Sequence, residues 1–201
     1  MKTLTRLLAV ACLVLLAAAP ATRAAEPSFP IDQVLGRADA PVTIIEYASP
    51  TCSHCAHFHK TVLPQLKAEW LDTGRAKLIY RDYPTGPHAL SVGAAMIPHC
   101  AGPERYFGLL GLIMDQQERW MGSDNPLAEL KKLAKLAGMG EDKVDACLRR
   151  QDLAGAIDAR ARDAYDRLGI DGTPAFLIGG KVLPGARPFE ELDAALKAAA
   201  K

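Results

Sequence analysis

The chain has 201 residues, of which 49% are hydrophobic and 23% are charged, as in ordinary folded proteins. This balance excludes a disordered tail or a charge-driven polymer. The formal net charge of +1 gives no indication of the basic excess that a nucleic-acid surface needs, so we expect no nucleic-acid partner.

The N-terminus has the layout of a secretory signal. Two basic residues precede the apolar run Leu7–Ala19, and small residues follow it up to Ala24. This order predicts a signal peptide over residues 1–24, cleaved after Ala24, and hence an exported protein. Cleavage after Ala21 and an uncleaved membrane anchor are the alternatives. Lipidation of Cys12 is less favoured, because that cysteine lies inside the apolar run.

The first part of the remaining chain has a β-α-β pattern. Residues 25–37 form a polar lead-in that contains proline, and no strand is expected there. The β-branched run Val42–Tyr47 predicts a buried strand. A helix is expected from about Cys52, with a kink at Pro64. Lys77–Arg81 predicts a second strand, and the crossover is long enough for parallel pairing.

A long helical segment and a closing β-β-α unit follow. Apolar residues at three-to-four spacing predict helices over Ala89–His99, Tyr106–Arg119, Pro126–Ala137, Glu141–Leu148 and Leu153–Leu168. The runs Ala175–Ile178 and Lys181–Leu183, joined by Gly179-Gly180, predict a hairpin, and Phe189–Ala200 predicts a last helix. We therefore expect an α/β protein with one mixed sheet, helices on both faces and a helical insertion.

The chemistry is expected at Cys52-Ser53-His54-Cys55, where a strand passes into a helix. Cys52 would lie at the open amide end of the helix, where N–H groups and the helix dipole stabilise a thiolate. His54 adds a nearby donor or positive charge. Stabilising the thiolate favours the reduced form, so the disulfide would be a strong oxidant. Cys55, one turn further along, is expected to be the more buried, resolving thiol.

Other interpretations of this motif exist. It could be an inert structural disulfide, although so short a loop gains little from cross-linking. It could also be half of a zinc site or a copper site, but the chain has no second CxxC. We interpret His57 and His59 as surface residues and not as ligands, although His59 could still tune the charge of the site. We expect no metal and no cofactor.

A second motif, Gly172-Thr173-Pro174, stands directly before the predicted hairpin. A CxxC at a helix start, a late Thr-Pro and a closing helix together resemble the thioredoxin fold. With a helical segment between the two halves, the chain is similar to the DsbA-like thiol oxidoreductases over Pro41–Ala200. The resemblance implies a thioredoxin-fold domain made of residues 25–86 and 169–201, with residues 87–168 as the helical insertion. It also implies a cis bond before Pro174, packed against the CxxC.

The resemblance suggests roles for further residues. A buried acid that helps to move protons at the resolving cysteine is common in the family, and Glu46 holds that position; an exposed strand carboxylate is the alternative. Thr173 and Pro174 are expected to bind an extended substrate. Ser53 stands where proline is common, and threonine before the proline also occurs in isomerases. The redox potential is therefore open.

Cys100 and Cys147 lie 47 positions apart in the helical segment and lack CxxC spacing. Removal of the signal peptide with Cys12 leaves four cysteines, and an even number in an exported protein favours two disulfides. We predict a structural disulfide between them that stabilises the fold by about 4 kcal/mol in the loop-entropy view. A second redox-active pair is the alternative.

Taken together, these features predict an exported enzyme, a thiol:disulfide oxidoreductase that introduces disulfides into newly secreted proteins. By resemblance, its location is the periplasm and its reoxidant is a quinone-linked membrane partner of the DsbB kind. An isomerase or reductase is the alternative within the same chemistry. A metal-binding or chaperone module is the alternative outside enzymology.

Overall fold

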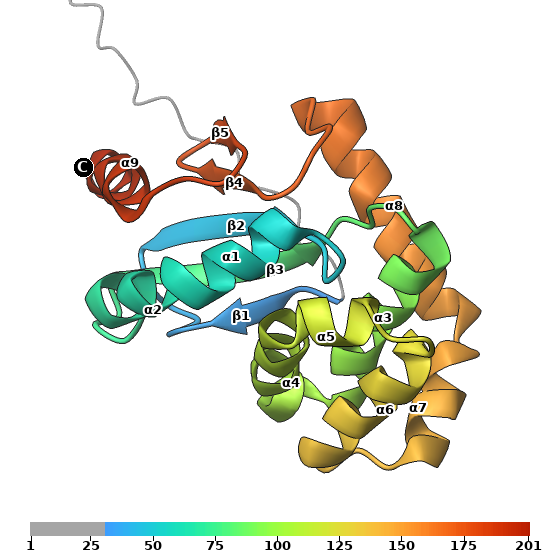
Figure 1. Cartoon of the computed structure of the whole chain (residues 1–201). Helices are drawn as coiled ribbons and strands as arrows, with labels where there is room; N and C mark the ends of the chain where they lie inside the picture. The colour runs from blue at the N-terminus through green and yellow to red at the C-terminus, as the bar shows by residue number, and fades with distance from the viewer. Residues whose placement is uncertain (1–30) are drawn as a thin grey trace, which may run out of the picture.

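The structure is a computed structural model that describes residues 31–201, so the predicted signal peptide over residues 1–24 lies outside the described residues. The elements are shown in Figure 1. In chain order they are β1 (Gln33–Leu35), β2 (Val42–Ala48), α1 (Ser53–Thr61), α2 (Leu63–Leu66), a π-helical turn (Lys67–Leu71), β3 (Ala76–Asp82), α3 (His88–Ala101), α4 (Pro103–Asp115), α5 (Gln117–Met121), α6 (Pro126–Leu136), α7 (Glu141–Leu148), α8 (Gln151–Leu168), β4 (Ala175–Ile178), β5 (Lys181–Pro184) and α9 (Phe189–Ala199).

Within the described residues the strands form one mixed sheet in the order β1-β3-β2-β4-β5. β2 and β3 pair in parallel, and β2 pairs antiparallel with β4. β4 and β5 form the expected hairpin around Gly179 and Gly180, which both have positive φ, a conformation that favours glycine. The predicted α/β architecture with a central mixed sheet is therefore confirmed.

The sequence interpretation missed β1. Residues 25–37 were expected to contain no strand, but Gln33–Leu35 pair antiparallel with β3. The strand has three residues, and its central Val34 is 40% exposed. So short and half-buried a segment has too few residues to show an alternating pattern, and its pairing depends on the edge that β3 offers.

The helix after β2 is interrupted, as Pro64 predicted. α1 ends at Thr61, and Pro64 lies in the first turn of α2. A π-helical turn then carries the chain to Leu71. Proline has no N–H to donate to the preceding turn, which explains the break at this point.

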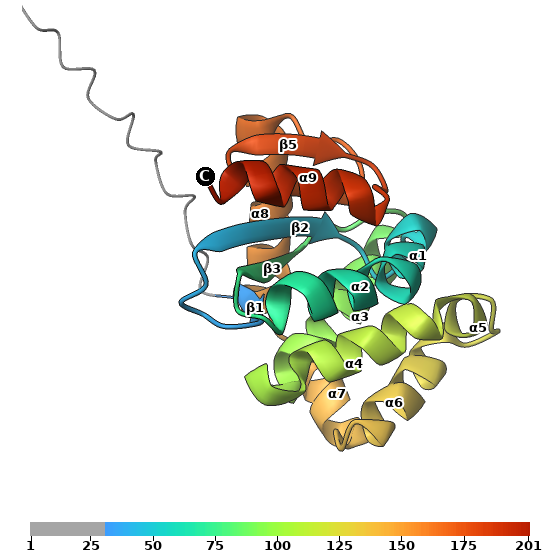
Figure 2. The ribbon, with the colours of Figure 1, turned by 90° about the vertical axis from the view of Figure 1, so that its left-hand side faces the viewer.

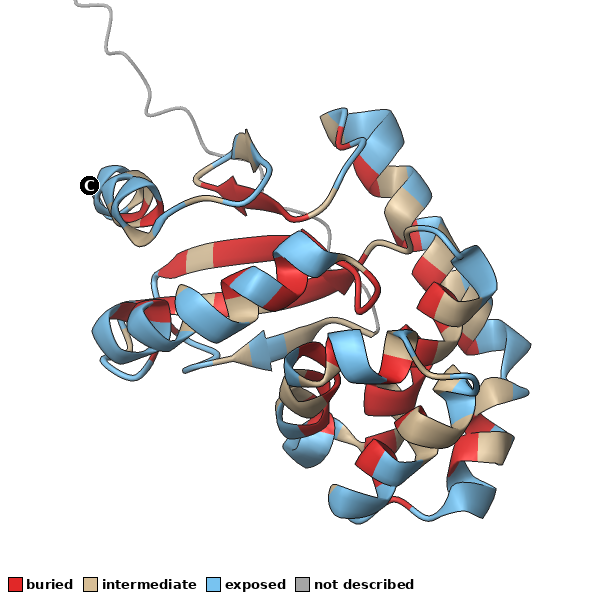
Figure 3. Cartoon of the chain, viewed as in Figure 1, coloured by how far each residue is buried: buried red, intermediate tan, exposed pale blue. Residues whose placement is uncertain are grey.

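Helices cover both faces of the sheet. On one face, Ile44 and Ala48 of β2 pack with residues of α1, α2 and α9. On the other face, Ile45 and Tyr47 pack with Ala164 of α8. Because β2 is buried on both faces, its sequence is almost continuously apolar. Figure 3 shows β2, β3 and β4 as the buried centre, with the outer sides of the helices exposed.

The helices between β3 and β4 have a hydrophobic cluster of their own, which contains Ile97, Leu109, Ile113 and Trp120. Figures 1 and 2 both show α4 to α7 gathered beside the β1 edge of the sheet.

The helix predicted over Tyr106–Arg119 is in fact two helices, α4 and α5. The division into domains at residues 87 and 168 stays a prediction. No helix within residues 31–201 is long and apolar enough to cross a bilayer.

A buried charged cluster ties the helical segment to the sheet. Arg160 of α8 is fully buried, and its Nη1 donates to Asp82 Oδ2 at the end of β3 over 3.2 Å. Nε2 of His99, on α3, lies 2.8 Å from the same oxygen. Beside them, Arg81 forms a bidentate pair with Asp32. Breaking one buried pair leaves its partner's charge uncompensated, so this cluster fixes how the helices sit against the sheet.

Candidate active site

Cys52 is the N-cap residue of α1, with an extended backbone, and its side chain is half-buried. The pKa of Cys52 is lowered to about 5, first by a hydrogen bond from the Cys55 thiol. The side chain of Thr173 and the backbone N–H groups of Cys55 and His54 lower this pKa further, while burial opposes them. A thiolate at Cys52 is thus the stable form at neutral pH.

Cys55 has the opposite environment. Its side chain is fully buried one turn into α1. Burial raises the pKa of the Cys55 thiol far above its ordinary range, and the neighbouring Cys52 and Glu46 charges raise it further. The two cysteines therefore differ as the sequence led us to expect: Cys52 can act as a nucleophile, whereas Cys55 holds its proton.

Thr173 and Pro174 lie directly beside Cys52, and the peptide bond between them is cis. The sulfur of Cys52 lies 3.4 Å from the carbonyl oxygen of Thr173, to which it donates when it is protonated. β4 begins immediately afterwards, at Ala175. The pairing of β4 with β2 thus brings the Thr-Pro motif to the start of α1, although the two motifs are far apart in sequence.

Glu46 is fully buried on β2, so the alternative of an exposed carboxylate is wrong. Its Oε1 lies 3.0 Å from His59 Nε2. Its Oε2 has no hydrogen-bond partner within the described residues. The surface interpretation of His59 is also wrong, because its side chain is only 6% exposed, whereas His57 is exposed as expected. Helical spacing turns His59 toward the sheet together with Cys55.

His54 contributes to the site differently from the sequence hypothesis. Its side chain is exposed. The contribution of His54 to the lowered pKa of Cys52 comes from its backbone N–H. Any residue except proline would present that N–H at this position, so the geometry of the helix start matters here more than the imidazole.

Sequence reasoning missed a glutamine that supports the motif. Gln117 of α5 is buried, and its Nε2 donates to the carbonyl oxygens of Pro50, over 2.7 Å, and of Cys52, over 2.9 Å. A hydroxyl network around Ser49 also braces this loop, and its other members are Thr51, Thr85 and Ser91. A glutamine in a helix shows no pattern in the sequence that would mark such a role.

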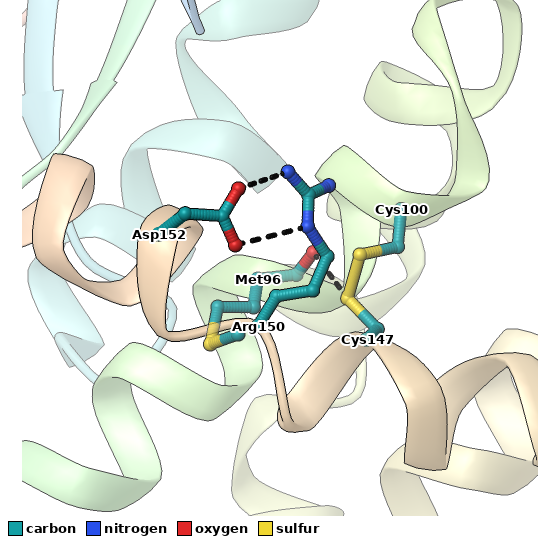
Figure 4. The surroundings of a disulfide bond; sticks show 5 residues. All are labelled: Met96, Cys100, Cys147, Arg150 and Asp152. Atoms are coloured by element: carbon teal, nitrogen blue, oxygen red, sulfur yellow. Dashed lines mark hydrogen bonds and ion pairs between the residues drawn. A yellow bond between two sulfur atoms is a disulfide. The ribbon is translucent and has the colours of Figure 1, made fainter.

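Cys100 and Cys147 form a disulfide between α3 and α7, with their Cα atoms 5.9 Å apart. Figure 4 shows the bridge beside the carbonyl of Met96, which lies 3.3 Å from the sulfur of Cys147. The bridge lies in the helical segment, away from the Cys52 motif. Its role, structural or redox-active, stays a prediction.

Within residues 31–201, no group of three or more His, Cys, Asp or Glu side chains is placed so that it could hold a metal ion.

Comparisons with known proteins agree with this geometry. The family described as Thioredoxin matches residues 29–198. The putative protein-disulfide oxidoreductase RC0029 of Rickettsia conorii is 30% identical over 80% of this chain, which spans only 59% of that relative's length. A probable disulfide bond formation protein D of Bacillus cereus is 26% identical over 77% of this chain and 73% of its own.

Solved structures give the same picture. The alpha-DsbA1 of Wolbachia pipientis superposes with a TM-score of 0.79 at 27% identity, over 86% of this chain and 92% of its own. BdbD of Bacillus subtilis, at 20% identity and a TM-score of 0.72, covers 87% of this chain and 95% of its own, and shares the fold.

Proposed function

Because the chain belongs to the thioredoxin family and is DsbA-like, we propose that it is an exported thiol:disulfide oxidoreductase that introduces disulfides into newly secreted proteins. The observation that carries the proposal is the contrast between the two cysteines. The pKa of Cys52 is lowered to about 5, and that of Cys55 is raised. A stabilised Cys52 thiolate favours the dithiol, which makes the disulfide form oxidising.

The reaction begins with the pair as a disulfide. A thiolate of the substrate attacks the sulfur of Cys52, and Cys55 leaves and takes up one proton. A second substrate thiolate then attacks the substrate sulfur of the mixed disulfide and releases Cys52 as a thiolate. Two electrons pass from the substrate to the pair, and the substrate gains a disulfide.

The surrounding residues have distinct parts in this scheme. The backbone at Thr173 and Pro174, next to Cys52, binds an extended substrate segment by strand-like hydrogen bonds. Glu46, buried near Cys55, exchanges the proton that Cys55 takes up or releases. The amide of Gln117 holds the loop before α1 in place, which keeps Cys52 at the helix start.

The proposal includes a location and partners. The predicted signal over residues 1–24 would deliver the protein to the periplasm, where the clients are reduced secreted proteins. A quinone-linked membrane protein of the DsbB kind would restore the disulfide. Sequencing the N-terminus of the protein recovered from a periplasmic extract tests the export step, with Ala25 as the expected first residue.

The decisive experiment measures the redox potential of the Cys52–Cys55 pair by equilibration with glutathione, together with oxidation of a reduced two-cysteine peptide. An oxidase should have a potential between about −180 and about −120 mV and should oxidise the peptide. A potential near about −270 mV, typical of thioredoxin, with no peptide oxidation, would instead identify a reductase. Cys52→Ser serves as the control, because it removes the nucleophile.

A further inference from the structure

We propose that the segment Tyr83–Thr85, directly after β3, is a clamp that holds the loop of Thr173 at its distance from Cys52, with the Tyr83 hydroxyl as the group that sets this distance. The inference rests on the proposed function, in which an extended client binds beside Thr173. Tyr83 acts through that loop and not on the sulfurs, so it is a positioning residue for the attack of the client thiolate.

Tyr83 joins the bases of the two loops that meet at Cys52. Its backbone N–H donates over 2.8 Å to the carbonyl oxygen of Ala48, the last residue of β2. Its hydroxyl donates over 2.8 Å to the carbonyl oxygen of Ile170. Ala48 lies four positions before Cys52, and Ile170 lies three positions before Thr173. A single residue therefore links the start of one loop to the start of the other.

The loop of residues 169–174 has few other anchors. It belongs to no helix or strand, and the N–H of Ile170 donates to a carbonyl oxygen of α8 over 3.3 Å. Within residues 31–201, only the side chains of Tyr83 and Cys52 donate to carbonyl oxygens of this loop. The Tyr83 hydroxyl thus anchors the loop just ahead of Thr173, the residue that contacts the reactive sulfur.

The surroundings of Tyr83 keep its hydroxyl in the donor form. Burial raises the pKa of Tyr83, and the charge of Asp171 raises it further. The ring packs against the hydrophobic cluster of β2, β4 and α8 that contains Ile45 and Ala164. Because this packing fixes the ring, a phenylalanine at the same position would keep the packing and lose the hydrogen bond alone.

The other end of the clamp supports the loop of Cys52. The hydroxyl oxygen of Thr85 lies 2.9 Å from that of Thr51, and Thr85 donates to the hydroxyl of Ser49 over 3.1 Å. The carbonyl oxygen of Ser49 in turn accepts the N–H of Cys52 over 3.1 Å. Pro84 restricts the backbone between the two ends of the clamp, so one stiff segment contacts both loops.

The spacing of the two loops matters because a client thiolate must attack in a defined geometry. A client segment bound at Thr173 places its cysteine beside Cys52 only if the loops keep their spacing. A displacement of about 1 Å can cost about 100-fold in rate. A small thiol such as dithiothreitol needs no backbone contact, so the clamp should affect the reaction of client peptides and not that of dithiothreitol.

The test compares two reactions of the oxidised protein, one with the reduced two-cysteine peptide over a range of concentrations and one with dithiothreitol, each quenched by acid and read by mass. Tyr83→Phe should raise the half-saturating peptide concentration by about 2- to 10-fold, the usual net effect of one hydrogen bond, and leave the dithiothreitol rate unchanged. Tyr165→Phe, which removes the hydroxyl of an exposed tyrosine on α8, is the matched control and should behave as the wild type.

A second measurement does not depend on the client. Thr173 lowers the pKa of Cys52, so a loosened loop in Tyr83→Phe should raise the pKa of Cys52. The ultraviolet absorbance of the thiolate in the reduced protein measures this change. Thr85→Val, at the other end of the clamp, should also raise the half-saturating peptide concentration. Cys55 should stay unlabelled by alkylating agents in both variants, which excludes a general loosening of the fold.

A wild-type half-saturating concentration together with a wild-type pKa of Cys52 in Tyr83→Phe would overturn the inference. Equal losses in Tyr83→Phe and Tyr165→Phe, or losses accompanied by labelling of Cys55, would overturn it too, because they indicate a general effect on the fold. Failure of the proposed function is a separate result: the wild type would then not oxidise the peptide, and the pKa of Cys52 in Tyr83→Phe would alone decide the inference.

Discussion

The carbonyl oxygen of Thr173 lies 3.4 Å from the sulfur of Cys52, although 121 positions separate the two residues. The hairpin half of the fold therefore completes the site that the β-α-β half begins. If a substrate segment binds at Thr173, as proposed, its cysteine thiolate would lie beside the sulfur of Cys52 that it attacks.

Cys52 should be the first cysteine to react with an alkylating agent. In the reduced protein, its labelling rate should rise with a midpoint near pH 5, the pKa at which its thiolate forms. Cys55 should stay unlabelled until the protein unfolds, because it is buried. Peptide mapping of the labelled protein checks this. Equal labelling of both cysteines would contradict the assignment.

Thr173→Val should raise the pKa of Cys52. Valine keeps the shape of threonine but loses the hydroxyl that lowers this pKa. A hydrogen bond to a charged group corresponds to about one pKa unit. The ultraviolet absorbance of the thiolate, followed across acidic pH, measures the change. Thr43→Val, the same substitution on β2 and outside the site, is the matched control; equal values for the two variants would count against a role for Thr173.

The stability of the reduced protein should rise with pH. The pKa of Cys52 is about 5 in the folded state against an ordinary value of 9.0. Between these values the unfolded chain binds the extra proton, so the free energy of unfolding grows as pH rises from about 5 and is lost again as pH falls through 5. Urea unfolding at pH 5 and pH 8, compared with Cys52→Ser, measures the gain. If the difference in free energy of unfolding between the wild type and Cys52→Ser were the same at both pH values, the stabilised thiolate would be contradicted.

The Cys100–Cys147 bridge should survive a mild reductant that opens Cys52–Cys55. The lowered pKa of Cys52 makes it a good leaving thiol, so its disulfide should be reduced more easily than the Cys100–Cys147 bridge. Replacing both cysteines of the bridge by alanine should lower the free energy of unfolding by up to about 4 kcal/mol. Mass mapping after partial reduction checks the order of opening. Loss of both bridges at one reductant concentration would identify a second redox pair.

Gln117→Ala should destabilise the loop before α1. It leaves the carbonyl oxygens of Pro50 and Cys52 without the amide that they share, at a cost of about 1–3 kcal/mol. Thermal unfolding measures this loss. Gln116→Ala, one position earlier, removes a side chain that donates to the exposed Asp115, and it should change the melting temperature little. If both variants lowered the melting temperature equally, the loss of stability would reflect a general effect on this end of α5 and not the hydrogen bonds of Gln117.

Much of the fold follows from local pattern. The strands Val42–Ala48 and Ala175–Ile178 and the helices α3 and α6 to α9 are evident from apolar spacing and from glycine and proline. β1 is not, because three half-exposed residues form a strand only when an edge is available. The break between α4 and α5 at Gln116 also lacks a glycine or proline that would mark it.

The site residues likewise include some that a sequence motif identifies and some that it does not. Cys52, Cys55 and Pro174 belong to motifs with recognisable neighbours, so the sequence identifies them. His59 and Gln117 do not. Each contacts a residue on another element, His59 with Glu46 of β2 and Gln117 with the loop before α1. Such contacts depend on how helices pack, which spacing along one helix does not specify.

The two edges of the sheet bear on how an oxidase of the proposed kind would avoid being trapped by its unfolded clients. β1 has three residues, and β5 has four, with exposed Lys181 and Pro184 at its ends. Short strands that end in lysine or in a residue without an N–H are poor templates for an added strand. An extended client would therefore find no long open row of unpaired backbone groups at either edge, and the proposed contact at Thr173 would end once the disulfide had been transferred.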